Sequence, residues 1–147
     1  MVEYYKIITS FAVVNNPDYL VNGGHIDQGL IMLDKEQIIN DCPFLKGAVE
    51  LLLNYDPIGR VGNYKGVYEL STAIECYTPD DGSDPGEGTI GVEELMKVIT
   101  FTTYCDKRIV NDNQIEIFIN KLAEIHPWEH PVIQLHGNGT IKMWDKD

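Results

Sequence analysis

The segment "EIHPWEHP" places His126, Glu129 and His130 within five residues. Imidazole and carboxylate groups are ligands that zinc and copper accept. Pro127 lies between the two histidines and disfavours helical geometry at the residue before it, so the histidines are not expected to share a helix face. In an extended chain they would lie about 13 Å apart, too far to hold one ion without a turn. Two interpretations therefore stay open: a divalent-metal site for copper or zinc, or a rigid exit from a helix into a strand.

Other reactive side chains form no pattern that identifies a catalytic site. The sequence has no G-x-S-x-G segment, and its three cysteines, Cys42, Cys76 and Cys105, contain no C-x-x-C pair. Separated cysteines in a reducing compartment are most simply small buried residues. We therefore assign no catalytic residue, and the sequence favours a protein that is not an enzyme.

The glycine-rich stretch "GRVGNYKG" at 59–66 carries two cations, Arg60 and Lys65. It lacks the lysine followed by serine or threonine of a phosphate-binding P-loop. A strand is expected after it, whereas loops that bind phosphate usually lead into a helix N-terminus. The stretch is therefore predicted to be a tight turn.

Composition and charge exclude several classes of function. The 147 residues include 11 basic and 23 acidic side chains, which gives a formal net charge of −12. Nucleic-acid binding needs clustered basic residues, so we expect no nucleic-acid partner. No apolar run approaches the roughly 20 residues of a membrane helix, and the first residues do not have the pattern of a signal peptide. We expect a cytoplasmic protein that does not bind membranes.

Hydrophobic periodicity predicts four strands and two helical regions. Period-two alternation predicts strands at about 3–14, 67–78 and 96–105, and a shorter one at 131–135. A Gly-Asn-Gly turn at 137–139 would lead into a final hairpin strand.

The first helical region is expected from Asp34, which with Gln37 would form a capping box, to about residue 55. Pro43 should break it and serve as the first residue of a second helix. Another helix is expected from Asp112, as its N-cap, to His126.

This order predicts a single ferredoxin-like domain over residues 1–147. Its class is α+β: a β-α-β-β-α-β pattern with a mainly antiparallel sheet, both helical regions on one face, and an added C-terminal strand. Residues 14–58 would form an enlarged first crossover, and 79–95 a flexible acidic loop. The other sheet face would be left partly uncovered, so we expect the chain to associate with itself.

Two stretches together resemble a known family. "GRVGNYKGVYELSTA" at 59–73 and "AEIHPWEHPVIQL" at 123–135 are similar to segments of the YqfO-type inserted domain of the Nif-three-like (NGG-interacting factor) family, and a similar H-P-Y-E phrase occurs in CutA proteins. The opening "YYKIIT" also matches the first strand of such domains. The resemblance implies a ferredoxin-like domain of the CutA and PII-like group, which commonly forms homotrimers.

The resemblance covers about half of the chain and has clear departures. The segments that hold the two-metal site of full Nif-three-like proteins have no counterpart in this sequence, so that site is not carried over. His130 stands where the family usually has Glu, and Trp128 where it has Tyr. The enlarged 14–58 segment and the acidic 79–95 loop also differ from the family pattern.

Three functional hypotheses follow. The leading one is a non-enzymatic, oligomeric binding or regulatory module whose ligand the sequence does not identify. The second is a copper- or zinc-binding protein that uses His126, Glu129 and His130 and is related to metal tolerance. The third is a hydrolase with a site between subunits.

Overall fold

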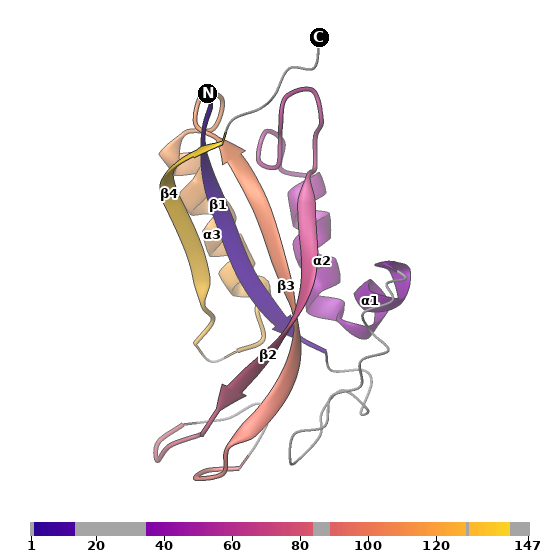
Figure 1. Cartoon of the computed structure of the whole chain (residues 1–147), viewed down its shortest axis with the longest axis vertical. Helices are drawn as coiled ribbons and strands as arrows, with labels where there is room; N and C mark the ends of the chain where they lie inside the picture. Colours follow the sequence, from indigo (N-terminus) through magenta and orange to yellow (C-terminus); the bar gives the residue numbers. More distant parts are fainter. Residues whose placement is uncertain (1, 14–34, 84–88, 129, 142–147) are drawn as a thin grey trace.

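The computed structural model describes residues 2–13, 35–83, 89–128 and 130–141 of the chain (Figure 1). Within these residues, four strands and three helices follow one another in the order β-α-α-β-β-α-β. They are β1 (Val2–Ala12), α1 (Lys35–Asp41), α2 (Pro43–Leu53), β2 (Tyr68–Tyr77), β3 (Glu94–Asp106), α3 (Asp112–Ile125) and β4 (Ile133–Ile141). No helix in the described part of the chain is long and apolar enough to cross a membrane.

The four strands form one antiparallel sheet in the order β2-β3-β1-β4. The central strand β1 pairs with β3 on one side and β4 on the other, so that Ile7 lies opposite both Thr103 and Leu135. The two crossovers, one through α1 and α2 and one through α3, place the last strand beside the first. This is the split β-α-β arrangement of the ferredoxin-like fold, and the predicted fold class is confirmed.

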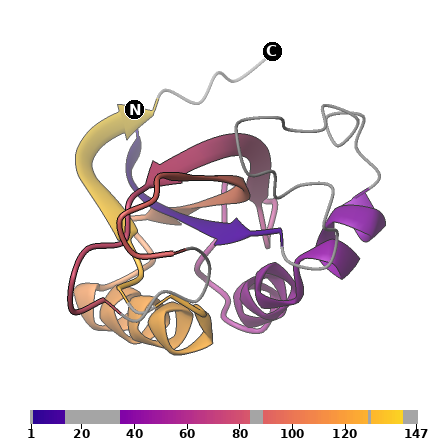
Figure 2. The same cartoon turned by 90° about the horizontal axis from the view of Figure 1, so that it is seen from below.

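Helices α2 and α3 lie side by side against one face of the sheet (Figure 2). Between them and the sheet is a continuous core of buried side chains. It is made of Leu45, Ala48, Val49 and Leu52 from α2, Ile115, Phe118 and Leu122 from α3, and Ile7, Phe11, Ile99 and Phe101 from the sheet. Full burial of one such large side chain contributes roughly 1.5–3 kcal/mol. Within each helix the buried positions recur every three or four residues, so one face of each helix enters the core.

The break at Pro43 is confirmed, because α1 ends at Asp41 and α2 begins at Pro43. A proline in the first turn of a helix costs little, since the N–H that it lacks would have no partner within the helix. Asp34, the predicted cap of the first helical region, lies outside the described residues, as do residues 14–34 of the predicted crossover.

The predicted N-cap of α3 was wrong by one residue. Asn111, not Asp112, caps the helix: its side-chain oxygen accepts a hydrogen bond from the Gln114 N–H at 2.8 Å, and the Gln114 side chain accepts one from the Asn111 N–H at 2.9 Å. This reciprocal pair satisfies two backbone donors that the first turn leaves without partners.

The predicted turn at 137–139 was also wrong, because β4 continues through Gly137 to Ile141. Lys6 lies opposite His136, whereas Tyr4 lies opposite Gly139, so β4 holds one extra residue and forms a β-bulge. A Cβ atom on Gly137 would lie only 2.6 Å from Cε1 of Tyr5. Glycine is needed here to admit the Tyr5 ring. Thr140 and Ile141, expected to begin a separate hairpin strand, belong to β4, and the rest of that expected strand lies outside the described residues.

The capping box gives a first prediction. We expect Asn111→Ala to lower the free energy of unfolding by about 1 kcal/mol, because the substitution leaves a helix N–H without its acceptor. Asn113→Ala is the matched control, since Asn113 is exposed in the first turn of the same helix. Chemical denaturation of both variants measures the effect. Equal stability of the two variants would contradict the assignment of Asn111 as the cap.

Candidate functional site

His126 is the first residue after α3, and its side chain is buried, with 6% of its surface exposed. Its backbone is extended (φ −66°, ψ 131°), as expected for a residue before proline. The ring Nε2 lies 2.7 Å from the Ser10 carbonyl oxygen, and Nδ1 lies 3.3 Å from the backbone nitrogen of Trp128. A carbonyl can only accept and a backbone N–H can only donate. The ring is therefore neutral, with its proton on Nε2.

Aromatic packing holds the His126 ring on both sides. Phe11 stacks on it with ring centroids 4.7 Å apart, and Trp128 meets it edge-on at 4.8 Å. Trp128 also packs against the small buried cluster that includes Ala12 and Val98. The exit from α3 is thereby attached to the end of β1, which agrees with the interpretation of this segment as a rigid exit from a helix.

His126 does not fit the role of metal ligand. Both of its ring nitrogens already have protein partners, and a metal would have to displace one of them. Glu129 lies outside the described residues, and His130 lies on the surface. Nowhere in the described ranges do three His, Cys, Asp or Glu side chains gather in a way that could hold an ion. Metal binding through His130 stays a prediction.

The two buried cysteines are not placed as nucleophiles. Burial raises the pKa of the Cys105 thiol to about 12, so it carries almost no thiolate at neutral pH. The Cys42 thiol donates a hydrogen bond to the Ala12 carbonyl oxygen, at 3.1 Å. The prediction was wrong for Cys76, which was expected to be buried but is exposed on β2. The two buried thiols therefore act as core residues, as the sequence predicted.

The glycine-rich stretch forms the predicted tight turn. Val61 and Tyr64 exchange two backbone hydrogen bonds across it, of 2.9 and 3.0 Å, and Gly62 takes a left-handed conformation. Arg60 makes a bidentate ion pair with Asp56, with distances of 2.7 and 2.9 Å, and this pair lowers the pKa of the Asp56 carboxyl. Arg60 is therefore already paired.

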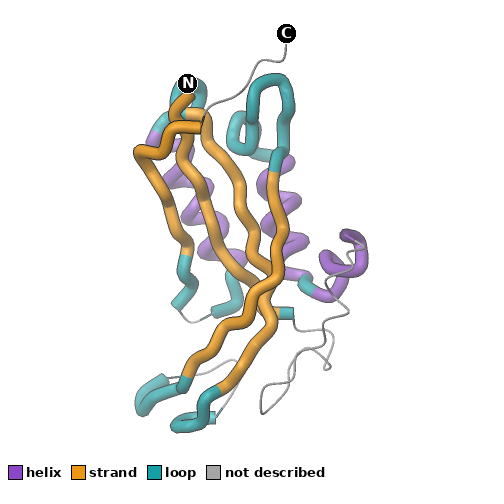
Figure 3. Tube along the Cα trace, in the orientation of Figure 1, coloured by secondary structure: helices purple, strands orange, loops and turns teal. Residues whose placement is uncertain are grey.

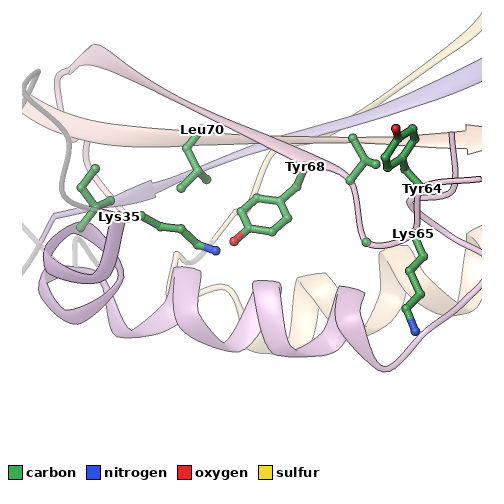
Figure 4. A pocket seen from close by; sticks show the side chains of 8 residues that line it. Lys35, Tyr64, Lys65, Tyr68 and Leu70 are labelled. Atoms are coloured by element: carbon green, nitrogen blue, oxygen red, sulfur yellow. The ribbon is translucent and has the colours of Figure 1, made fainter.

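A groove lies between this turn, α1 and β2 (Figure 4). Its volume is about 510 Å³, and it is lined by Lys35, Ile38, Tyr64, Lys65, Gly66, Val67, Tyr68 and Leu70. The hydroxyl of Tyr68 is buried and has no hydrogen-bond partner among the described residues. The sequence did not predict this groove: Lys65 was considered only as part of a phosphate loop, and nothing in the spacing connects Lys35 with Tyr68.

No described helix covers the opposite face of the sheet (Figure 2). Half-buried side chains occupy the middle of this open face: Ile8, Ser10, Thr100 and Thr102. The hydroxyls of Ser10 and Thr100 are hydrogen-bonded at 2.9 Å. The centre of the face is thus lined by hydroxyls, and it is more polar than the sequence led us to expect.

The hairpin of β2 and β3 extends beyond α2 and α3 (Figure 3). Ile74 on β2 is 57% exposed there, although its alternation matches that of core residues. Ile90 and Val92, just before β3, are also exposed. The projecting end of this hairpin, called the arm below, therefore carries three exposed apolar side chains, whereas Ile8 at the centre of the open face is half-buried.

The buried histidine makes stability depend on pH. Burial lowers the pKa of His126 below its unfolded value of about 6.5, so the unfolded chain binds more protons in mild acid. The contribution of His126 to stability is therefore fully present above about pH 6.5 and is lost as the pH falls below that value. We expect His126→Gln to flatten the fall in unfolding free energy between about pH 7 and pH 5, as measured by denaturation at several pH values. The control is His136→Gln, at an exposed position on β4, and equal slopes for both variants would refute the assignment.

Comparisons with known proteins agree on the fold. No protein-family profile matches the sequence, and no curated protein matches it. The chain is similar in structure to a NIF3-related protein of Bacillus cereus, with a TM-score of 0.58 and 13% identity; the match covers 95% of this chain but only 26% of that one. It is also similar to the divalent ion tolerance protein CutA1 of Ehrlichia chaffeensis, with a TM-score of 0.53 and 12% identity over 97% of this chain and 87% of the other. The chain therefore has the fold of the NIF3-like and CutA-like structural group.

Proposed function

We propose that this chain is a non-enzymatic binding or regulatory module that works as an oligomer. The observation that carries the proposal is the open sheet face, which no described helix covers. A half-buried, hydrogen-bonded face such as that around Ser10 and Thr100 can pack against a different patch of the next copy, and such head-to-tail contacts can close into a ring. The resemblance to CutA-type domains implies three copies.

The projecting arm supports the same proposal. Ile74, Ile90 and Val92 expose apolar surface to solvent, and burying such side chains against another chain would be favourable. The arm and the open face would then contribute an apolar rim and a polar centre to one interface. The hydrolase alternative would need a nucleophile beside a base, and the two buried thiols are not placed for that role.

A charge on the open face tests this proposal. We expect the wild-type chain to be an oligomer at micromolar concentration and Thr100→Lys to be a monomer, because each interface would bury an unpaired ammonium group. Size-exclusion chromatography with light scattering gives the mass. Asn120→Lys introduces the same side chain at an exposed position of α3, on the helical side of the sheet, and should stay oligomeric.

Circular dichroism of both variants shows whether each is folded. A wild-type chain that elutes as a single copy would contradict the proposal. So would a folded Thr100→Lys variant that keeps the wild-type mass.

The second candidate function is binding of a divalent metal such as copper or zinc. It is favoured by the description of one structural neighbour as a divalent ion tolerance protein. Of the two described residues of the predicted set, His130 is the one on the surface, and several copies in an oligomer could contribute one imidazole each. In this form of the proposal His126 stays a structural residue, because both of its nitrogens are engaged.

Calorimetric titration with copper and with zinc tests the second candidate. We expect His130→Ala to lower the affinity at least about tenfold, since even the loss of a group that only orients a ligand costs that much. His136→Ala is the control, because His136 is exposed and its Nε2 lies 2.7 Å from Oε1 of Gln134. Equal binding by wild type and His130→Ala would exclude a site at His130.

A further inference from the structure

The groove beside β2 has a rigid wall. The Tyr68 ring stacks on the buried Phe101 ring, with centroids 5.8 Å apart. Next to it, the Val67 carbonyl oxygen accepts a hydrogen bond of 2.8 Å from the Thr103 hydroxyl, and the Val67 N–H donates one of 2.8 Å to Gly59. These contacts hold the aromatic ring and the neighbouring backbone in place without a ligand, which lowers the cost of ordering a site on binding.

The buried Tyr68 hydroxyl makes this wall unusual. Its oxygen has no hydrogen-bond partner among the described residues, although the ring is well packed. A buried hydroxyl without a partner costs about 1–3 kcal/mol. Most buried polar atoms in native proteins are paired, so an orphan in the wall of a groove indicates a place for an acceptor from outside the chain.

The adjacent cation is Lys35. Its ammonium lies 5.2 Å from the centroid of the Tyr68 ring, and Figure 4 shows its side chain extending toward the Tyr68 hydroxyl. The Lys65 ammonium points away from Tyr68 in the same view and lies near enough to Asp56 to lower the pKa of that carboxyl. One cation and one hydroxyl donor therefore converge at one end of the groove.

The remaining lining residues are largely apolar. Ile38, Val67 and Leu70 supply aliphatic surface, and none of the described residues that line the groove is acidic. The volume of about 510 Å³ is within the range of pockets for small molecules, about 300–1,000 Å³. The net charge of −12 opposes the approach of an anion, but at physiological salt that field is screened over about 8 Å, whereas Lys35 is in the groove itself.

We propose that this groove binds a small organic anion with an aromatic or aliphatic body and one carboxylate or phosphate group. The anionic oxygen accepts a hydrogen bond from the Tyr68 hydroxyl and pairs with the Lys35 ammonium, and the body lies along Ile38 and Leu70. This inference names a ligand class and so rests on the binding role proposed above, but it does not depend on the oligomeric state.

A pair of fluorescent probes with the same body tests the proposal. Anilinonaphthalene sulfonate carries an anionic group, and phenylnaphthylamine is its uncharged parent. We expect the folded wild-type chain to bind the sulfonate saturably and more tightly than the parent. Lys35→Gln and Tyr68→Phe should each weaken binding of the sulfonate about tenfold, because each removes a hydrogen bond to a charged group. Displacement by naphthoate or by naphthyl phosphate then distinguishes a carboxylate from a phosphate ligand.

Two controls separate binding from folding. Lys46→Gln removes the same charge at an exposed position of α2 and should bind the sulfonate like wild type. Tyr68→Phe removes a buried hydroxyl without a partner, so the thermal stability of the free protein should be kept or raised while affinity falls. Equal affinity for the two probes, or equal binding by the Lys35→Gln and Lys46→Gln variants, would overturn the anion site. Light scattering on the same samples tests the oligomer separately.

Discussion

The burial of one side of the central strand β1 is the constraint on which the rest of the structure depends. Side chains alternate between the two faces of a strand, so Ile7 and Phe11 can both enter the core only if their neighbours Ile8 and Ser10 face the other way. Because β1 pairs with both β3 and β4, the orientation of its side chains determines which face of the whole sheet is buried. Helices α2 and α3 then cover the apolar side, and the open face follows as a consequence.

The same strand explains the chemistry of the histidine-rich segment. The carbonyl of Ser10, beyond the end of the β1–β4 pairing, accepts a hydrogen bond from His126. A buried backbone carbonyl without a hydrogen-bond donor would destabilise the fold. The imidazole Nε2 supplies that donor, and Nδ1 accepts a hydrogen bond from the Trp128 N–H. The His126 imidazole, whose lone pair suggests a metal ligand in the sequence, is thus used to stabilise the junction between α3 and β4.

Local patterns in the sequence predicted the fold because each pattern depends only on the geometry of one helix or strand. The spacing of apolar residues such as Phe118 and Leu122 on one face of α3, and the helix boundaries at Pro43 and Pro127, depend on helix geometry alone. The cap of α3 was misplaced because Asn111 and Asp112 are both good caps, although the spacing of Asn111 to Gln114 carried the deciding signal.

Other features could not be read from the sequence because they depend on tertiary contacts. Glycines at 137 and 139 fit a turn and a bulge equally well, and the approach of the Tyr5 ring decides for the bulge. The groove brings together Lys35 and Tyr68, which α2 and the turn at 59–66 separate along the sequence. No periodicity links two residues so far apart in the chain.

The partners of the basic side chains explain why a groove in so acidic a chain favours an anion. Arg60 is paired with Asp56, Arg108 with the buried Asp106, and Lys107 with Glu3. Lys35 instead lies over an aromatic ring, where the contact is worth about 0.5–1 kcal/mol at an exposed site. That is less than a charge-assisted hydrogen bond provides, about 1.5–3 kcal/mol. A ligand oxygen placed between Lys35 and the Tyr68 hydroxyl would add such a bond and satisfy the orphaned donor at the same time, which is why the groove favours an anion over a neutral ligand.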